Sequence, residues 1–340
     1  MAVFCKLIFT SATHFNTSSV VRKLLVKCVA LFASFLFASI YAIINMDTTM
    51  STDEPLPFTS NDESYALSRA YVPEHLPGLM ATVSRATPFL LDGYLGYAKD
   101  NWLIFVGYPL DGGFDPAHCE ERIARALELH RPEYLWFIGP EIPPSLADSC
   151  RARQSDQYLR LDLAKWQIKS SLRREVEQAA KFLTVEHTRE FTDDHHELVD
   201  ELMERVELPP FVAGLYESLP EYIAGCETSL LLNARDTKGK LSAFFVVECA
   251  AKRFDTYVLG CHSKKNYVSH ASDLLFHEMI TLTHESGKPE INLGLGVNRG
   301  IRRFKTKWGG QPYLAYEFCE CHYGPPEQLS VLDALLGEKL

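Results

Sequence analysis

The chain has 340 residues, of which 46% are hydrophobic and 23% are charged, with 19 glycines and 18 prolines. This composition excludes a disordered, a collagenous and a coiled-coil protein, and the length is typical of two domains. Because 34 Lys and Arg residues stand against 44 Asp and Glu residues, the net charge is -10. A generally basic nucleic-acid-binding protein is therefore excluded, no DNA partner is expected, and contact with a polyanion must be confined to a local patch.

Nine cysteines are scattered along the chain, most of them inside apolar runs. An odd number of cysteines without regular spacing indicates reduced, buried thiols and not a disulfide framework. We therefore expect a reducing compartment and a cytoplasmic protein.

The first 45 residues raise the question of a membrane anchor. Residues 28–44 carry no charge, and three basic residues precede them within residues 22–27. Such a run is at the lower limit for a helix that spans a bilayer, and its flanking charges would place the following chain outside the cytoplasm, in conflict with the cysteines. Two interpretations of residues 1–45 stay open: an inner-membrane anchor, or an extension upstream of a translation start at Met46 or Met50. Membrane contact is expected only in the first case.

The remainder of the chain divides into a linker and two domains. Residues 46–62 are polar and acidic, which is typical of a linker. We expect a first domain over residues 63–160, a second over residues 161–325, and a short C-terminal helix over residues 326–340.

The first domain contains one clear strand–helix–strand unit. Residues 102–108 and 134–138 are apolar runs that predict buried strands, and Asp115-Pro116 predicts the start of a helix that ends near residue 130. This spacing is that of a β-α-β unit.

The second domain opens with a helix predicted over residues 165–182, on which Lys165, Lys169 and Arg173 would form a basic stripe. Such a stripe is either a solvated helix face or a ligand contact. The elements that follow are a second helix, an antiparallel meander of three strands, a helix, a strand and a last strand pair, predicted around residues 198–206, 229–235, 241–249, 255–261, 272–286, 290–295 and 313–321.

The most distinctive segment is residues 294–310, GLGVNRGIRRFKTKWGG, with five glycines and five cations in an otherwise acidic protein. The glycines allow close approach of the backbone to a ligand, and the cations can neutralise a phosphate or a developing oxyanion. We expect a flexible basic hairpin that binds an anionic substrate. The substrate-binding candidates are Gly296, Asn298, Arg299, Arg302, Lys307 and Trp308. For Trp308, stacking on a substrate and filling the core both stay open.

Common cofactor motifs do not account for this segment. A dinucleotide-binding interpretation of the glycines fails because only about forty residues follow them, too few for the rest of such a sheet. The pair Cys319 and Cys321 lacks the second ligand pair of a zinc site, so two thiols on one face of a strand are expected. No metal and no tightly bound cofactor are predicted.

The segment before the helix predicted over residues 272–286 is a candidate donor-binding loop. Free backbone N–H groups at a helix start, with nearby lysines, can hold a phosphate, while a serine there can equally be a helix cap. The donor-binding candidates are Lys264, Lys265, Ser269, His270, Ala271 and Ser272.

From residue 165 to residue 317, the order of elements and the FKxKWGG segment at residues 304–310 resemble the GNAT superfamily of N-acyltransferases, in its Fem-type aminoacyltransferase branch. The resemblance implies a mixed α/β sheet with two tandem GNAT-like domains. It also implies that the donor binds where the strand ending near Cys261 separates from the strand ending near Leu295.

The function implied by the resemblance is transfer of an acyl or aminoacyl group from acyl-CoA or aminoacyl-tRNA to a small-molecule or peptide amine. Residues 266–271 contain no glycine, unlike the pyrophosphate loop of acetyl-CoA enzymes. This difference motivates an alternative, a non-catalytic GNAT-like module that binds an anionic ligand.

Three residues are the catalytic candidates. Attack of an amine on a carbonyl requires removal of a proton and stabilisation of an oxyanion. Lys305, in the FKxKWGG segment, is the candidate for electrostatic stabilisation. His262 at a strand end and Glu248 on the preceding strand are candidate bases, and a structural role stays open for both.

Overall fold

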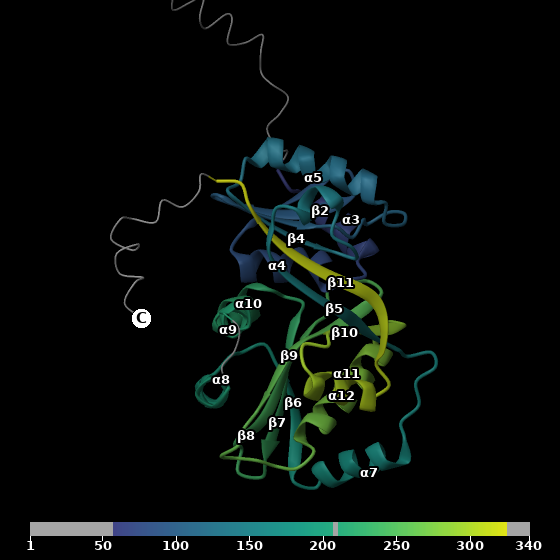
Figure 1. Cartoon of the computed structure of the whole chain (residues 1–340). Helices are drawn as coiled ribbons and strands as arrows, with labels where there is room; N and C mark the ends of the chain where they lie inside the picture. Colours follow the sequence, from purple (N-terminus) through teal and green to yellow (C-terminus); the bar gives the residue numbers. More distant parts are fainter. Residues whose placement is uncertain (1–56, 207–209, 325–340) are drawn as a thin grey trace, which may run out of the picture. The chain divides into compact units, whose positions relative to one another are not determined.

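The computed structural model describes residues 57–206 and 210–324 of the chain (Figure 1). The predictions for residues 1–45 and 326–340 lie outside the described residues. The linker predicted over residues 46–62 lies partly outside them. Its predicted end at residue 62 is too late, because a helix already begins at Ser60 and is capped by the Thr59 side chain. Within the described ranges, no helix combines the length and the apolar character needed to cross a membrane.

The described chain is organised around one mixed sheet of 11 strands, in the order β1-β2-β3-β4-β11-β5-β10-β9-β8-β7-β6. The mixed α/β architecture is therefore confirmed. The strands are β1 Thr87–Leu91, β2 Tyr94–Lys99, β3 Trp102–Val106, β4 Tyr134–Gly139, β5 Cys150–Asp162, β6 Leu183–Thr188, β7 Ser229–Asp236, β8 Leu241–Glu248, β9 Phe254–His262, β10 Glu290–Leu295 and β11 Gln311–His322.

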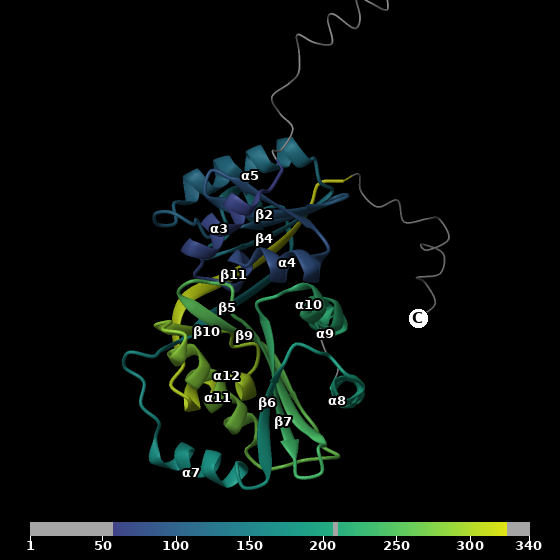
Figure 2. The same cartoon turned by 180° about the vertical axis from the view of Figure 1, so that it is seen from behind.

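The helical segments that accompany the sheet are α3 Ser60–Arg69, the 3-10 turn η1 Pro73–His75, α4 Pro77–Ser84, α5 Pro116–His130, α6 Pro144–Ala147, α7 Ser170–Ala179, α8 Asp193–Arg205, α9 Pro210–Glu217, α10 Leu219–Gly225, α11 Ala271–Glu285 and α12 Arg299–Lys307. Figures 1 and 2 show α11 and α12 on one side of the strands β7 to β9 and α8 to α10 on the other. Each side buries its own apolar cluster, which fixes both faces of the sheet.

The strand–helix–strand prediction for the first half is confirmed. The Asp115 side chain accepts a hydrogen bond of 3.1 Å from the Ala117 N–H, and Pro116 occupies the first turn of α5. The strands β3 and β4 on either side of α5 pair in parallel.

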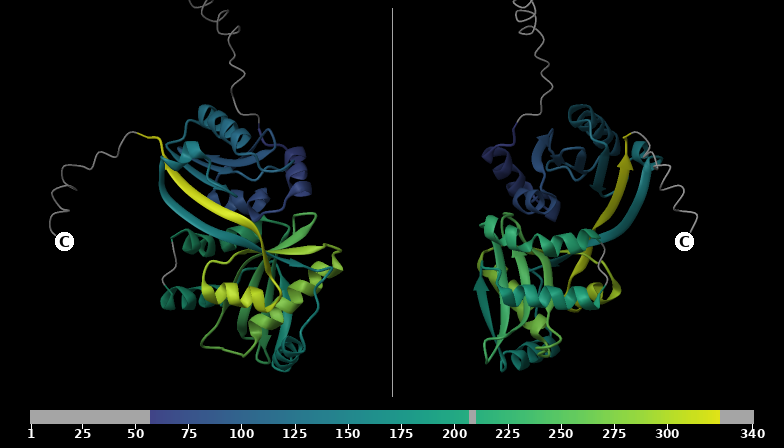
Figure 3. Two further views of the ribbon diagram at one scale, coloured as in Figure 1. Left: turned by 45° about the vertical axis from the view of Figure 1, so that its right-hand side comes forward. Right: turned by 90° about the vertical axis from the view of Figure 1, so that its left-hand side faces the viewer.

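Two long strands join the halves of the sheet. β5 pairs antiparallel with β11 over most of its length, and β11 continues along β4 of the first half (Figure 3). The expected strand pair around residues 313–321 is therefore the single strand β11. The expected domain boundary between residues 160 and 161 falls inside β5, so the two halves share a continuous sheet.

The helix predicted over residues 165–182 is shorter than expected, because α7 spans Ser170–Ala179. Lys165 lies before the helix and Lys169 is its N-cap residue. The predicted basic stripe along one helix face is therefore wrong, although Lys169 remains exposed.

The basic segment is a helix and not the expected hairpin. Asn298 accepts a hydrogen bond of 2.9 Å from the Ile301 N–H and so caps α12. Gly309, with φ +100°, and Gly310 follow its last turn. Because residues 301–308 contain neither glycine nor proline, a capped helix is the favoured local structure.

Candidate active site

The two parallel strands next to α12 pair only briefly. β10 pairs with β9 from Glu290 opposite Phe254 to Asn292 opposite Thr256, and Leu295 pairs instead with Tyr158 of β5. Gly294, with φ +66°, lies where β9 and β10 diverge. We call the space between the ends of these two strands the β9–β10 divergence.

The side chain of Lys305 enters this divergence from α12. Its Nζ donates a hydrogen bond of 2.7 Å to the carbonyl oxygen of Leu295 and lies 5.3 Å from the ring centroid of Tyr257 on β9. A Cβ atom on Gly294 would lie 3.9 Å from Nζ, in van der Waals contact, so the positive φ and not lack of space favours glycine here. Lys305 thus bridges the two strands at the point where they separate.

The environment of Lys305 changes its proton affinity. The residue is only 4% exposed. Burial lowers the pKa of Lys305 to about 7, with the negative charge of Asp156 raising it and the positive charge of Arg302 lowering it further. An amine with a pKa near neutrality is typical of functional sites, where proton affinity is matched to the chemistry.

Asp156 on β5 organises the loop before α12. Its carboxylate is paired with the Arg302 guanidinium and accepts a hydrogen bond of 2.8 Å from the Val297 N–H. A Cβ atom on Gly296 would lie 2.5 Å from the Arg302 side chain, so only glycine allows this guanidinium to lie against the backbone. Arg302 is therefore held beside the Lys305 site and does not extend freely into solvent.

The outer face of α12 borders an open hollow of about 530 Å³. It is lined by Lys169, Arg299, Arg302, Arg303, Thr306 and Lys307. We call it the basic hollow. Among the described residues, the side chains of Lys169, Arg299 and Arg303 have neither an ion pair nor a hydrogen bond. These three uncompensated charges favour an anionic ligand.

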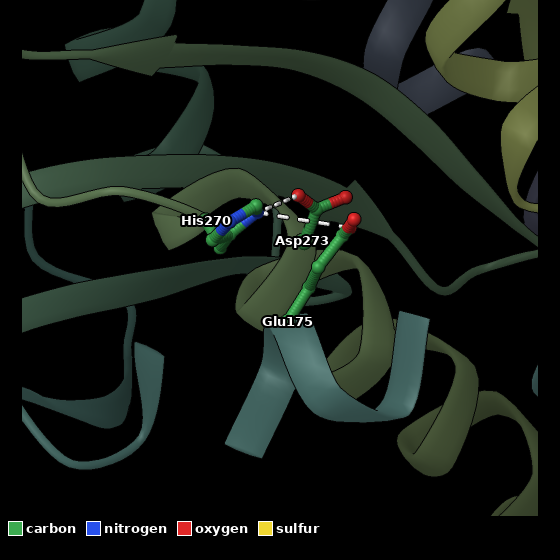
Figure 4. A group of neighbouring side chains, drawn as sticks. All are labelled: Glu175, His270 and Asp273. Carbon is green, nitrogen blue, oxygen red and sulfur yellow. Dashed lines mark hydrogen bonds and ion pairs between the residues drawn. The ribbon is translucent and has the colours of Figure 1, made fainter. Parts of the chain in front are cut away.

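Lys307, at the edge of the basic hollow, is paired with carboxylates near the start of α11. Its Nζ lies 2.7 Å from a carboxylate oxygen of Glu175 and 2.7 Å from one of Asp273. His270 Nδ1 lies 3.1 Å from the second oxygen of Asp273, as Figure 4 shows. Glu175, His270 and Asp273 have a spacing suited to a metal ion, but the Lys307 ammonium already supplies the cation for both carboxylates.

The donor-binding candidates around residues 264–272 do not form one site. The backbone N–H groups of Lys264 and Lys265 donate to the Glu201 carboxylate, at 2.5 and 2.7 Å. His270, with φ +66°, is the N-cap residue of α11, and no side chain caps the helix, so the alternative of a serine cap is wrong. Ala271 is buried, and Ser272 is half-buried. The Glu201 carboxylate therefore occupies the backbone N–H groups of Lys264 and Lys265, where a phosphate was expected.

Ser269 lines a second hollow of about 360 Å³ at this end of the sheet. The other lining residues are Gln178, Phe182, Asp236, Thr237, Tyr267 and Val268. Phe182 and Tyr267 are 56% and 60% exposed, which gives this hollow an apolar rim.

The two candidate bases lie apart from Lys305. Glu248 follows Val247, which belongs to the core under α11, so its side chain points to the opposite face of the sheet, where Tyr222, Cys226 and the Ala250 N–H donate to it. His262 is five residues beyond Tyr257 on β9, about 16 Å along a strand. Burial and the charges of Arg205 and Lys264 lower the pKa of His262.

Trp308 is a core residue. It is 1% exposed, its Nε1–H donates a hydrogen bond of 3.0 Å to Asp273, and its ring stacks on Phe276. Of the two roles left open for Trp308, the structure shows the core position. Asn298 serves as the helix cap of α12. Sequence reasoning missed Tyr257 and Asp156, which lie about 50 and about 150 residues before Lys305, because no local pattern links residues so far apart in the chain.

Comparisons with known proteins agree with this architecture. No family model and no curated protein matches the chain. Many solved structures are similar to this chain, among them the following three. The C-terminal domain of a putative lysylphosphatidylglycerol synthetase from Agrobacterium fabrum has 19% identity and a TM-score of 0.52, and the match covers 81% of this chain and 97% of that chain.

The L-PGS structure from Bacillus licheniformis has 14% identity and a TM-score of 0.51, over 84% of this chain and 98% of that chain. FemX has 12% identity and a TM-score of 0.51, over 77% of this chain and 96% of that chain. At these identities the likeness concerns the fold. The chain therefore shares its fold with the lysylphosphatidylglycerol synthetase domains and with FemX.

Proposed function

We propose that the protein is an acyltransferase that moves an acyl or aminoacyl group from an activated donor to an amine. The observation that carries the proposal is the buried amine of Lys305 at the β9–β10 divergence, next to the basic hollow on α12. A buried lysine without a carboxylate in contact is costly for folding, which favours a functional reason for its position.

The chemistry requires one bond to form and one to break. The neutral acceptor amine attacks the donor carbonyl, the new C–N bond forms, and the C–O or C–S bond of the donor breaks. The proton lost by the amine balances the charge of the leaving oxygen or sulfur. In between, the carbonyl oxygen becomes an oxyanion, and the Lys305 ammonium stabilises it. An adjacent negative charge raises the pKa of a lysine, so the amine becomes more fully protonated as the oxyanion develops.

An aminoacyl-tRNA fits as donor better than acyl-CoA. The backbone N–H groups of Lys264 and Lys265 donate to Glu201 and so are not open to a pyrophosphate. The free cations of the basic hollow, in contrast, suit a phosphate backbone. The names of the lysylphosphatidylglycerol synthetases with the same fold also favour an aminoacyl group. Aminoacyl-tRNAs and acyl-CoAs are both cytoplasmic, so this function is expected in the cytoplasm.

The test compares the wild type with Lys305→Ala in transfer from aminoacyl-tRNAs and acyl-CoAs to an amine acceptor. We expect at least a 100-fold loss of turnover, about 2.7 kcal/mol or more of transition-state stabilisation, with donor binding within twofold of the wild type. Lys252→Ala, which removes an exposed lysine at the β8–β9 turn, is the matched control. Turnover retained by Lys305→Ala would contradict the proposal.

A second candidate function is a non-catalytic module that binds an anionic ligand. The absence of a glycine in residues 266–271 and the carboxylates at the start of α11 favour it. If the wild type binds donors through the basic hollow and transfers from none of them, this candidate is the correct one.

A further inference from the structure

Glu74, in the turn η1, is a carboxylate surrounded by tyrosines. Its Oε2 accepts a hydrogen bond of 2.7 Å from the Tyr158 hydroxyl, and its backbone oxygen accepts one of 2.8 Å from the Tyr97 hydroxyl. The residue is half-buried. Three further phenol rings lie around Tyr158, with centroids 5.9 Å (Tyr108), 6.4 Å (Tyr313) and 5.5 Å (Tyr316) from the Tyr158 ring centroid. We call these five tyrosines and Glu74 the Glu74 cluster.

None of the six residues of the Glu74 cluster is cationic. The Arg160 guanidinium lies 4.9 Å from the ring centroid of Tyr313 and is paired with Glu290, not with Glu74. No described residue forms an ion pair with Glu74 or donates a hydrogen bond to its Oε1. Burial raises the pKa of Glu74, while the hydrogen bond from Tyr158 lowers it. A carboxylate in such surroundings is stabilised either by a proton or by a cation that enters beside it.

The chemistry of the lining selects the kind of cation. Tyrosine faces attract an ammonium group through their ring quadrupoles. A primary ammonium also donates hydrogen bonds, which the unoccupied Oε1 can accept, whereas a quaternary ammonium has no N–H to donate.

The Glu74 cluster adjoins the β9–β10 divergence. Tyr158 pairs in register with Leu295, the residue whose carbonyl oxygen accepts the hydrogen bond of Lys305. Asn292, the last residue of β10 that pairs with β9, donates a hydrogen bond of 2.8 Å to the Tyr313 hydroxyl.

The cluster also lies on the other face of the sheet from α11 and α12. Leu159 belongs to the core under α11, so its neighbour Tyr158 points to the opposite face. A molecule held by Glu74 therefore approaches the divergence from the side opposite α12 and the basic hollow.

We propose that the Glu74 cluster binds a primary ammonium group of the acceptor substrate, with the Glu74 carboxylate as its counter-ion and the tyrosines around it as aromatic neighbours. The identification of this ligand as the acceptor rests on the transferase function proposed above. The ammonium held there is a second group of the acceptor, distinct from the neutral amine that attacks the donor carbonyl, so the site binds and takes part in no bond-making step.

The test measures binding of n-butylammonium and of tetramethylammonium by titration calorimetry, without any donor. We expect n-butylammonium to bind to the wild type at millimolar concentration and tetramethylammonium to bind at least about tenfold more weakly. Glu74→Gln, which keeps the shape and an oxygen for Tyr158, should weaken the binding of n-butylammonium at least about tenfold. Glu63→Gln, at an exposed position on α3, should leave this binding unchanged.

Binding that is insensitive to Glu74→Gln, equal binding of the two cations, or no binding of n-butylammonium at about 100 mM would each overturn the inference. The control is the melting temperature of Glu74→Gln: a value equal to that of the wild type shows that a loss of binding is not a loss of fold. Because no donor is present, failure here leaves the Lys305 transfer test unaffected, and failure of that test leaves this binding intact.

Discussion

Lys305 donates a hydrogen bond of 2.7 Å from Nζ to the carbonyl oxygen of Leu295, ten residues earlier in the chain. This contact joins the last turn of α12 to the end of β10 and places an amine where β9 and β10 separate. The surroundings are apolar enough to lower its pKa to about 7. The predictions below follow from the charge at this position and from the residues that control it.

Lys305→Met should stabilise the protein. The folded-state pKa of about 7 lies below the ordinary value of 10.5, so between these pH values the unfolded chain binds more protons, and the stability of the wild type rises with pH. At pH 7 the variant should unfold with a free energy about 3 kcal/mol higher than the wild type, and the difference should shrink toward pH 10. Urea unfolding at both pH values measures this, and an equal or lower stability of Lys305→Met at pH 7 would count against it.

Asp156→Asn should shift the pH dependence of transfer. The Asp156 charge raises the pKa of Lys305, so its removal lowers that pKa further. Since the oxyanion role requires the ammonium, the alkaline fall in turnover should move to lower pH, by about half a unit to one unit. The measurement is a pH–rate profile, with Asp162→Asn on the same strand as the control. An unmoved alkaline limb would show that Asp156 does not act on Lys305.

Lys307→Met should destabilise the protein at neutral pH. The substitution leaves the carboxylates of Asp273 and Glu175 facing each other without their shared cation, and Asp273 is only 8% exposed. Because Lys307 itself is about a third exposed, the expected loss is about 1–2 kcal/mol. Chemical unfolding at pH 7 tests this, with Lys181→Met at an exposed site as control; equal stability of Lys307→Met and the control would refute it.

The double variant Arg299→Ala, Arg303→Ala should bind the donor more weakly. Both side chains line the basic hollow and have no partner among the described residues. If they contact phosphates of a tRNA, the slope of log affinity against log salt concentration should fall by about one per arginine. Fluorescence anisotropy of labelled tRNA at several salt concentrations gives the slope. Arg253→Ala, at an exposed position in the β8–β9 turn, is the control. An unchanged slope in the double variant would show that the basic hollow does not bind the donor.

Local patterns in the sequence were sufficient for several elements. The strand–helix–strand unit of β3, α5 and β4, the meander of β7 to β9, and the α11 and β10 crossover were all predicted within a few residues. Each rests on apolar runs, helix caps and turns that act over short distances. The helix α12 was missed, although Asn298 and Gly309 are ordinary start and stop signals, because the glycines around it were interpreted as flexibility.

The sequence by itself determined the mixed α/β class, most of the central elements, and the choice of Lys305 as the residue of interest. Only the tertiary structure decided that Lys305 is buried against Leu295 and Tyr257, that Asp156 restrains Arg302, and that Glu74 lies among five tyrosines. These relationships depend on pairing between strands that are far apart in the chain. Such pairing fixes burial and charge proximity, and therefore proton affinity, which no local pattern of residues encodes.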